Sequence, residues 1–287
     1  MFSLIISLHG VSLSQVASTP NEAVDITAKA GFKYIELPVT TWKIDPETIT
    51  NQGIKKIKDV LSAGVEASSI GMIWPRDYMM VTTSPLDWNR NISYAHKLFD
   101  FSAMMNVKVL NLGGPEVRSV PASIPYLDGL RILAKFWKEA CRHAEDVGVI
   151  VAIEHIVRSH ISNVADTTKQ IIDLVRAVDS PSFQIMAQVH QMVYCDLDVP
   201  AAIKASGELI KLVHIADVPG FNPITDPVKF VVPGQGKLDF LSVFRAFKAI
   251  KYDGEFCLEP SPNTLGKDYI SELTDGRRLL EAKWEQA

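Results

Sequence analysis

Eight short, mostly apolar and β-branched segments recur along this 287-residue chain, and longer segments with helical periodicity separate them. The predicted strands are Phe2–Leu8, Tyr34–Leu37, Glu66–Gly71, Lys108–Leu112, Ile150–Glu154, Gln184–Val189, Leu212–Ile215 and Glu255–Glu259. Strands that are apolar on both faces are typical of a parallel sheet covered by helices. The alternation therefore predicts an α/β fold with a parallel sheet.

The intervening segments predict amphipathic helices at Asn21–Ala30, Ile54–Ala63, Asp87–Met105, Leu130–Val147, Thr167–Val178 and Phe240–Ile250. Thr19 and Pro20 are a helix start signal, and glycines precede the following strands at Gly31, Gly64, Gly148 and Gly254. Eight such units in a chain of this length predict a (β/α)8 TIM barrel, formed by residues 1–287 as a single domain. An open doubly wound sheet is the alternative, weakened because no Gly-x-Gly-x-x-Gly follows the first strand.

Charge and cysteine usage restrict the partners and the compartment. The net charge is −4, and the charges are interspersed without a basic stripe, so we expect no nucleic-acid partner. The three cysteines, Cys141, Cys195 and Cys257, lie far apart, which is typical of buried thiols in a reducing compartment. The start MFSLIISLHG lacks a basic segment, and no apolar run approaches the ~18 residues that span a bilayer. We expect a cytoplasmic protein without a membrane partner.

Ligand-type side chains stand at the ends of four consecutive predicted strands. In a barrel the carboxyl ends of the strands carry the chemistry. The residues are Glu154 on the fifth strand, Gln188, His190 and Gln191 on the sixth, His214 and Asp217 on the seventh, and Glu259 on the eighth. Two buried carboxylates that converge on a pocket are costly without a cation between them. We therefore predict one divalent metal, Mn²⁺ first with Mg²⁺ or Co²⁺ as alternatives, bound by Glu154, Gln188, His214 and Glu259.

Each of these residues also has an ordinary structural interpretation when it is taken alone. A strand-end glutamate is often a helix-cap or salt-bridge partner, and a histidine in an apolar strand is often a core residue. His190 is thus either a further acid or base or a buried histidine without a role. Trp74 is either an apolar wall of a binding pocket or part of the core, and His9 is expected at the pocket rim with the same alternative.

Five segments, AGFKYIELP, VAIEHIVR, LVHIADVPG, PGQGKLDF and YDGEFCLEP, resemble in order and spacing the xylose isomerase-like barrel superfamily. The resemblance covers essentially the whole chain and is to the sugar isomerase and epimerase branch, which includes ketose 3-epimerases, hydroxypyruvate isomerase and inosose dehydratase. It implies that Glu154 and Glu259 bind the metal and face opposite sides of the substrate carbon, with His214 as a further ligand. It also implies that Arg158 and Glu36 lie at the substrate. Relatives often form dimers or tetramers, so a homo-oligomer remains open.

The sixth strand departs from the family pattern, which resembles Asp-Thr-x-His. Aligned without gaps, Gln188 stands where the ligand Asp is expected and Gln191 where the substrate-binding His is expected. An alternative alignment pairs His190 with that His and Ala187 with the Asp, which removes the ligand. We prefer the first alignment because a glutamine carbonyl can coordinate a hard cation. The metal site is then formally neutral instead of negative, so the cation is held less tightly but polarises a substrate oxygen more strongly.

Two carboxylates beside a metal-bound carbonyl or hydroxyl are suited to moving a proton on carbon. We predict a metal-dependent isomerase or epimerase of a keto-sugar or related polyhydroxy carbonyl compound, acting by carboxylate proton abstraction and a metal-stabilised enediolate. A lyase, either a dehydratase or an enzyme that cleaves 3-keto-glycosides including C-glycosides, is the alternative. The predicted catalytic residues are Glu154, Glu259 and His190, and the predicted substrate-binding residues are Arg158, Gln191, Glu36, Trp74 and His9. A DNA-repair endonuclease of this superfamily is a third alternative, but such an enzyme needs several more histidines than this chain has. A non-catalytic barrel is a fourth, which would be favoured if the purified protein held no metal.

Overall fold

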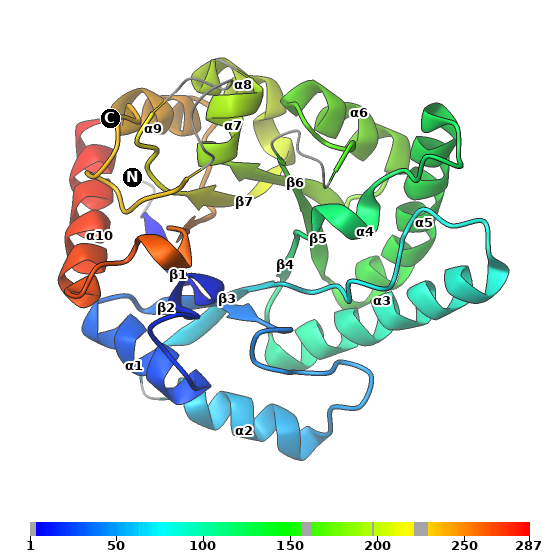
Figure 1. Ribbon diagram of the computed structural model, residues 1–287, viewed down its shortest axis with the longest axis horizontal. Coiled ribbons are helices and arrows are strands. Elements are labelled where there is room, and N and C mark those ends of the chain that lie inside the picture. The colour runs from blue at the N-terminus through cyan, green and yellow to red at the C-terminus, as the bar shows by residue number, and fades with distance from the viewer. Residues whose placement is uncertain (1–3, 63, 157–161, 197, 221–228) are drawn as a thin grey trace.

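A computed structural model describes residues 4–62, 64–156, 162–196, 198–220 and 229–287. Eight parallel strands close into a barrel in chain order, with β8 paired to β1 (Figure 1). The strands are β1 (Ile5–His9), β2 (Tyr34–Pro38), β3 (Glu66–Gly71), β4 (Val109–Leu112), β5 (Ile150–Glu154), β6 (Phe183–Gln188), β7 (Ile210–Ile215) and β8 (Glu255–Leu258). The predicted (β/α)8 barrel is confirmed, and the open-sheet alternative is excluded.

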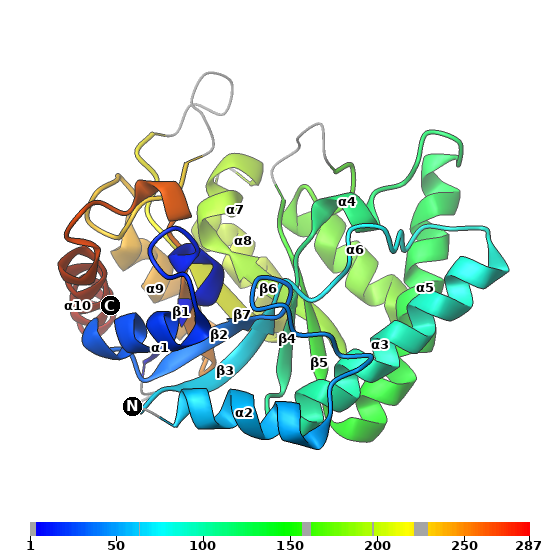
Figure 2. The same ribbon diagram turned by 60° about the horizontal axis from the view of Figure 1, so that its bottom comes forward.

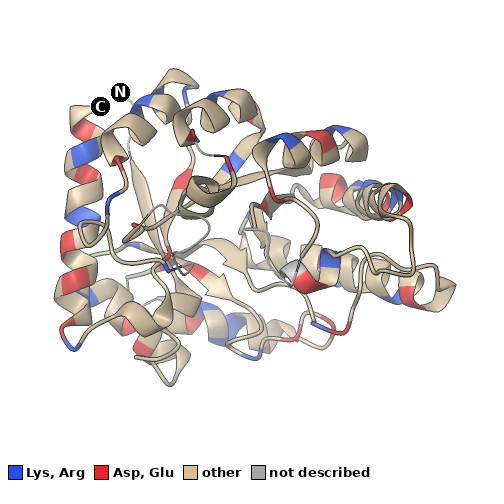
Figure 3. Ribbon diagram, turned by 45° about the horizontal axis from the view of Figure 1, so that its top comes forward, with Lys and Arg blue, Asp and Glu red and all other residues tan. Residues whose placement is uncertain are grey.

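Helices surround the strands on the outside of the barrel (Figure 1). They are α1 (Pro20–Lys29), α2 (Asn51–Leu61), α3 (Pro85–Met105), α4 (Pro115–Arg118), α5 (Tyr126–Val147), α6 (Thr168–Val178), α7 (Val189–Cys195), α8 (Val199–Ser206), α9 (Phe240–Ala249) and α10 (Tyr269–Gln286), with short 3₁₀ helices η1 (Gly10–Leu13), η2 (Gly207–Leu209) and η3 (Pro262–Thr264). Figure 2 shows α4 and α7 at the upper end of the barrel, where β4 and β6 end. Acidic and basic positions are mixed along the outer helices (Figure 3).

Local signals in the sequence explain where several helices begin and end. Thr19 and Glu22 form a reciprocal capping box at the start of α1, with Pro20 in the first turn. Thr167 and Gln170 form the same arrangement at the start of α6. Helix α5 ends at Gly148, whose φ of 73° is in the left-handed region that glycine adopts without steric cost. These caps fix the entry and exit of the chain around the strands that carry the candidate site.

The sequence prediction was wrong about the end of the sixth strand. Strand β6 ends at Gln188, and the chain turns directly into α7. His190 and Gln191 are therefore helical residues above the strand end and not strand residues. The short apolar run Val189–Cys195 fits a strand or a buried helix equally well, because it is too short for periodicity to distinguish them.

The interior of the barrel has an apolar part and a polar part. Side chains of β4 to β7 form a small apolar cluster, Val109, Ala152, Met186 and Leu212. Polar side chains from β1, β2 and β3 are fully buried, namely Ser7, Glu36 and Ser69. A buried carboxylate is tolerated only with hydrogen-bonding or charged partners, so the polar part identifies where a functional site lies. In the described part of the chain, no helix is both long enough and apolar enough to traverse a lipid bilayer.

Candidate active site

His214 of β7 lies between two carboxylates inside the barrel. Its Nδ1 is 2.8 Å from Glu259 Oε2, and its Nε2 is 2.9 Å from Glu36 Oε2. Burial alone would lower the pKa of His214, but the facing carboxylates raise it well above its ordinary value. Both ring nitrogens then donate, so the imidazolium balances part of the negative charge of the cluster.

Glu259 follows β8 directly and is the centre of the cluster. Gln188 Nε2 donates to Glu259 Oε2 at 3.1 Å, and His190 Nε2 lies 3.2 Å from the same oxygen. His9 Nδ1 lies 3.7 Å from the other oxygen, Oε1. Burial raises the pKa of Glu259, but the positive charges of His214 and His9 hold it well below its usual range. The Glu259 side chain is 19% exposed, whereas those of His190 and His214 are 0% exposed, so Glu259 is the member that reaches the solvent.

Glu36 of β2 is fully buried beside His214. Its Oε1 is 3.2 Å from His9 Nε2 and accepts from Asn111 Nδ2 at 3.4 Å, while its Oε2 accepts from Ser69 Oγ at 3.3 Å. Burial raises the pKa of Glu36, but His214 and His9 outweigh it and lower the pKa to about 2. Glu36 therefore contacts described side chains through both oxygens, and a direct contact with substrate stays a prediction.

Glu154 ends β5 and is buried at the same end of the barrel. Burial raises its pKa to about 8, although the charge of Arg118 opposes the rise and the charge of Glu259 adds to it. Arg118, which is fully buried, donates from Nη1 to the Leu112 carbonyl and from Nη2 to the Glu154 carbonyl, both at 3.0 Å. Arg118 thus joins the ends of β4 and β5 through their backbone carbonyl groups.

Of the remaining predicted site residues, Gln191 and Trp74 are described by the structure and lie in different places. Gln191 is buried in α7, next in the chain to His190. Trp74 packs edge-on against Tyr94 of α3 and Phe136 of α5, with ring centroids 5.1 and 5.8 Å apart. These contacts match the core-packing interpretation of Trp74, and its contact with substrate remains untested. Arg158 lies outside the described residues.

The donor set fits a hard divalent cation. Among the described residues, two groups have donor atoms within 4.8 Å of one another: His9, His214 and Glu259, and Glu36, His214 and Cys257. Glu154 belongs to neither group. Gln188 Oε1 is buried without a hydrogen-bond partner, although its Nε2 is bonded to Glu259. An orphaned buried carbonyl oxygen is rare in folded proteins, and here it adjoins carboxylate and imidazole donors that Mn²⁺ and similar ions accept.

Asp217 was noted at the end of the seventh strand, but its role was not recognised from the sequence. It accepts hydrogen bonds from four backbone N–H groups, those of Val218, Gly234, Gly236 and Leu238, each at 2.9 Å. A Cβ on Gly236 would lie 2.3 Å from Asp217 Oδ1, so only glycine fits there. The segments LVHIADVPG and PGQGKLDF are therefore joined through one carboxylate. An aspartate followed by a glycine-rich segment was the available signal.

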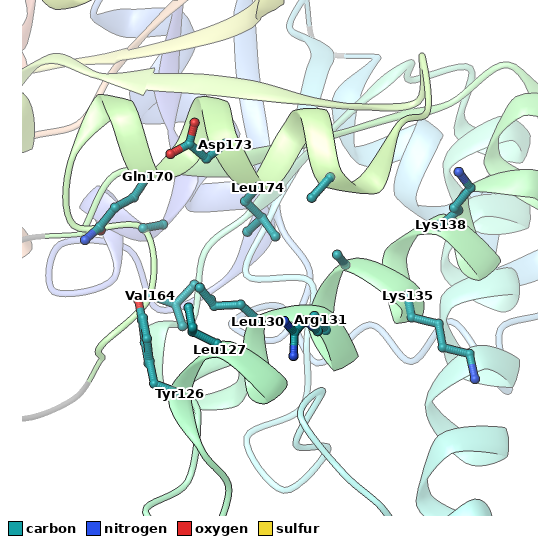
Figure 4. A pocket seen from close by; sticks show the side chains of 13 residues that line it. Tyr126, Leu127, Leu130, Arg131, Lys135, Lys138, Val164, Gln170, Asp173 and Leu174 are labelled. Atoms are coloured by element: carbon teal, nitrogen blue, oxygen red, sulfur yellow. The ribbon is translucent and has the colours of Figure 1, made fainter.

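A cavity of about 640 Å³ lies elsewhere, between α5 and α6 on the outer surface of the barrel. Figure 4 shows Leu127, Leu130 and Val164 on one side of it and Leu174 on the other. None of the residues of the His214 cluster lines this cavity. The cavity is therefore separate from the candidate site.

Comparisons with known proteins agree with this architecture. Residues 24–281 match the family model of the xylose isomerase-like TIM barrel. The chain belongs to this family. It is 22% identical over 267 residues to the inosose dehydratase of Clostridium perfringens (strain ATCC 13124), covering 79% of the chain and 88% of that protein.

Two solved structures share the fold at low identity. D-psicose 3-epimerase from Clostridium cellulolyticum H10 superposes with a TM-score of 0.82 at 15% identity, covering 98% of this chain and 99% of that one. The 3-keto-D-glucoside 4-epimerase from Escherichia coli superposes with a TM-score of 0.77 at 16% identity, covering 98% of this chain and 100% of that one. These relatives are named as two sugar epimerases and an inosose dehydratase, and the two solved structures share the barrel fold of this chain.

Proposed function

We propose that this protein is a metal-dependent isomerase or epimerase of a keto-sugar or a related polyhydroxy carbonyl compound. One observation carries the proposal. Glu154 ends β5 and Glu259 directly follows β8, so two carboxylates from different strands lie at the same mouth of the barrel. Two carboxylates at one barrel mouth can remove a proton from carbon and return one to it.

Glu154, Gln188, His214 and Glu259 would hold the cation, with Mn²⁺ favoured and Mg²⁺ or Co²⁺ as alternatives. When bound, such an ion stabilises the negative charge that develops on a neighbouring substrate oxygen. The unpartnered Gln188 Oε1 supports a ligand role for Gln188, because it is the one buried acceptor of that side chain. His214 must give up one ring proton to bind a metal, so we expect metal binding to weaken as the pH falls.

The side chains around the two carboxylates have separate tasks. One carboxylate accepts the proton from the substrate carbon, and the other returns a proton on the opposite face for epimerisation or to the adjacent carbon for isomerisation. His190 contacts Glu259 from α7 at 3.2 Å, so it is placed to orient that carboxylate or to relay a proton to it. Burial lowers the pKa of His190, which favours the neutral ring that such a relay needs.

A lyase is the second candidate. The similarity to inosose dehydratase supports it, as does the glutamine at the end of β6. Removal of the same α-proton leads to elimination when a leaving group stands on the β-carbon, so the two candidates share their first step. Only the lyase reaction releases water or an aglycone.

The test combines metal analysis of the purified protein with proton exchange in D₂O. The substrates are ketohexoses, ketopentoses, an inosose and 3-keto-glycosides, each followed by NMR. Deuterium uptake into an epimer or isomer supports the first candidate, and loss of water or aglycone supports the second. A protein that holds no metal and exchanges no substrate proton contradicts both.

Variants of the two carboxylates test the mechanism on any substrate that exchanges. Glu154→Gln and Glu259→Gln are each expected to lower the exchange rate by at least about a thousandfold, because general acid–base catalysis contributes 10²–10⁴ and a ligand is lost as well. Glu208→Gln, the same change at an exposed position, is the control. Retention of the wild-type rate in either site variant rejects the two-carboxylate mechanism.

A further inference from the structure

A further carboxylate, that of the partly buried Glu255, lies at the opposite end of the barrel from the candidate site. It begins β8, and its Oε1 accepts hydrogen bonds from Ser7, from Ser68 at 2.8 Å and from Ser69 at 3.0 Å. Ser7 and Ser68 each donate a hydroxyl hydrogen to this oxygen and Ser69 shares its own with it, which compensates a charge that partial burial disfavours. Burial raises the pKa of Glu255, and the three serines oppose the rise. None of the predicted catalytic or metal-binding residues is part of this group.

A β-bulge brings two consecutive serines to the same carboxylate. Neighbouring residues of a strand normally point to opposite faces. Between β2 and β3 the pairing moves from Ile35 with Ala67 to Glu36 with Ser69, so Ser68 is the additional residue. Bulges redirect side chains in this way, and here Ser68 and Ser69 both reach Glu255.

Ser69 differs from Ser68 in a second contact. Its Oγ lies 3.0 Å from Glu255 Oε1 and 3.3 Å from Glu36 Oε2. Glu36 Oε2 is also the atom that faces His214 Nε2, at 2.9 Å, and His214 Nδ1 faces Glu259 at 2.8 Å. A series of polar contacts therefore runs along the barrel interior from Glu255 through Ser69, Glu36 and His214 to Glu259, in which the single hydroxyl hydrogen of Ser69 is shared between the two carboxylates.

The other contacts of Glu36 fix its second oxygen. His9 and Asn111 approach Oε1, at 3.2 and 3.4 Å, and not Oε2. The backbone of Gly71 also packs against this oxygen, since an added Cβ would lie 2.2 Å from Oε1. Among the residues that the structure describes, Ser69 is therefore the hydrogen-bonding partner of Glu36 Oε2 in addition to His214.

We propose that Ser69 is a positioning residue that links Glu36 to the Glu255 group and thereby fixes the orientation of the His214 ring. The proposal rests on the proposed function in one respect, namely that His214 is a metal ligand. Groups that orient a ligating histidine commonly change metal affinity by 10–100-fold. Ser69 acts through Glu36, so we expect the lower end of that range.

Ser69→Ala and Ser68→Ala are matched variants that test this role. Each removes one hydroxyl from Glu255, but only Ser69→Ala also removes a contact of Glu36. The first measurement is the exchange with solvent of the two His214 ring N–H protons, by NMR of ¹⁵N-histidine-labelled, metal-free protein. The second is Co²⁺ affinity by titration of its visible spectrum. Ser69→Thr, which keeps the hydroxyl, is the conservative variant, and thermal unfolding verifies that each variant is folded.

The proposal expects Ser69→Ala to accelerate exchange of the His214 protons and to weaken Co²⁺ binding about tenfold. Ser68→Ala should leave both within about twofold of wild type, and Ser69→Thr should restore both. Equal effects of the two alanine variants, or no effect of Ser69→Ala on the ring protons, overturn it. If the wild-type protein binds no Co²⁺, the metal part of the proposed function fails, and the ring-proton comparison alone decides the role of Ser69.

Discussion

At the scale of single residues, Gln188 decides the charge of the candidate metal site. Gln188→Asp adds a carboxylate beside the cation and is expected to tighten Mn²⁺ binding about tenfold, equivalent to about 1.4 kcal/mol. In the metal-free protein the new charge faces Glu259, so the variant should unfold at a lower temperature than wild type. Calorimetric titration and thermal unfolding measure the two effects. Gln52→Asp, an exposed change on α2, is the control, and unchanged affinity of Gln188→Asp shows that Gln188 is not a ligand.

Gly71 is a second residue whose identity the site requires. A Cβ at this position would lie 2.2 Å from Glu36 Oε1, and the Glu36 carboxylate cannot move without losing its contacts to His9 and His214. Gly71→Ala is therefore expected to lower the free energy of unfolding by about 1–3 kcal/mol. Gly53→Ala, where the Cβ would meet the side chains of Ile49 and Thr50 and no carboxylate of the site, should change stability less. Urea unfolding distinguishes them, and equal stability of the Gly71 variant would mean that Glu36 is loosely held.

The sequence predicted the cluster residues that carry charge or imidazole, because such side chains at strand ends are unusual. It did not predict Ser69 or Asn111. A hydroxyl or an amide in a strand is common, and only the bulge at Ser68 explains why Ser69 faces Glu36. Bulges leave no pattern in a single sequence, since they depend on how neighbouring strands pair.

At the scale of elements, the loop after β7 depends on Asp217. Four backbone N–H groups converge on its carboxylate, and an asparagine offers only one oxygen to accept them. Asp217→Asn is expected to lower the free energy of unfolding by about 2–3 kcal/mol, as for the loss of a charged hydrogen-bond acceptor. Denaturant unfolding measures this loss against Asp253→Asn, an exposed control. A loss no larger than that of the control would show that the loop does not need the charge.

The elements themselves were predictable to different degrees. The strands were evident as short apolar runs, and most of the long helices were evident from their period and a start or stop signal. Helix α10 was missed although Leu273, Leu280 and Trp284 bury one face at helical spacing. Its remaining positions are strongly charged, so the apolar pattern is weak. The boundary between β6 and α7 depends on the geometry of the barrel, and a short, mostly apolar segment does not predict it.

At the scale of the whole molecule, the barrel interior holds carboxylates at the ends of several strands and an apolar cluster between β4 and β7. The eight alternating strand and helix segments predicted the barrel. They did not predict how polar and apolar side chains are arranged inside it, because the register between neighbouring strands decides which side chains lie at the same height along the barrel axis. A fold with several buried carboxylates is stabilised by a bound cation, because a ligand that binds only the native state adds to the free energy of unfolding. The candidate metal is therefore coupled to the stability of the entire chain.

Metal binding is accordingly expected to raise the unfolding temperature of the wild-type protein. At a Mn²⁺ concentration 100 times Kd, linkage adds about 2.7 kcal/mol. For a chain of this size each kcal/mol shifts Tm by roughly 2 °C, so we expect a rise of about 5 °C. The double variant Glu154→Gln/Glu259→Gln should show no rise at the same concentration, and chelation with EDTA should return wild type to its metal-free Tm. Scanning calorimetry measures both proteins. An equal shift in the double variant would place the stabilising ion away from the barrel mouth, and no shift in wild type would mean that His214 and its carboxylates complete the site without a metal.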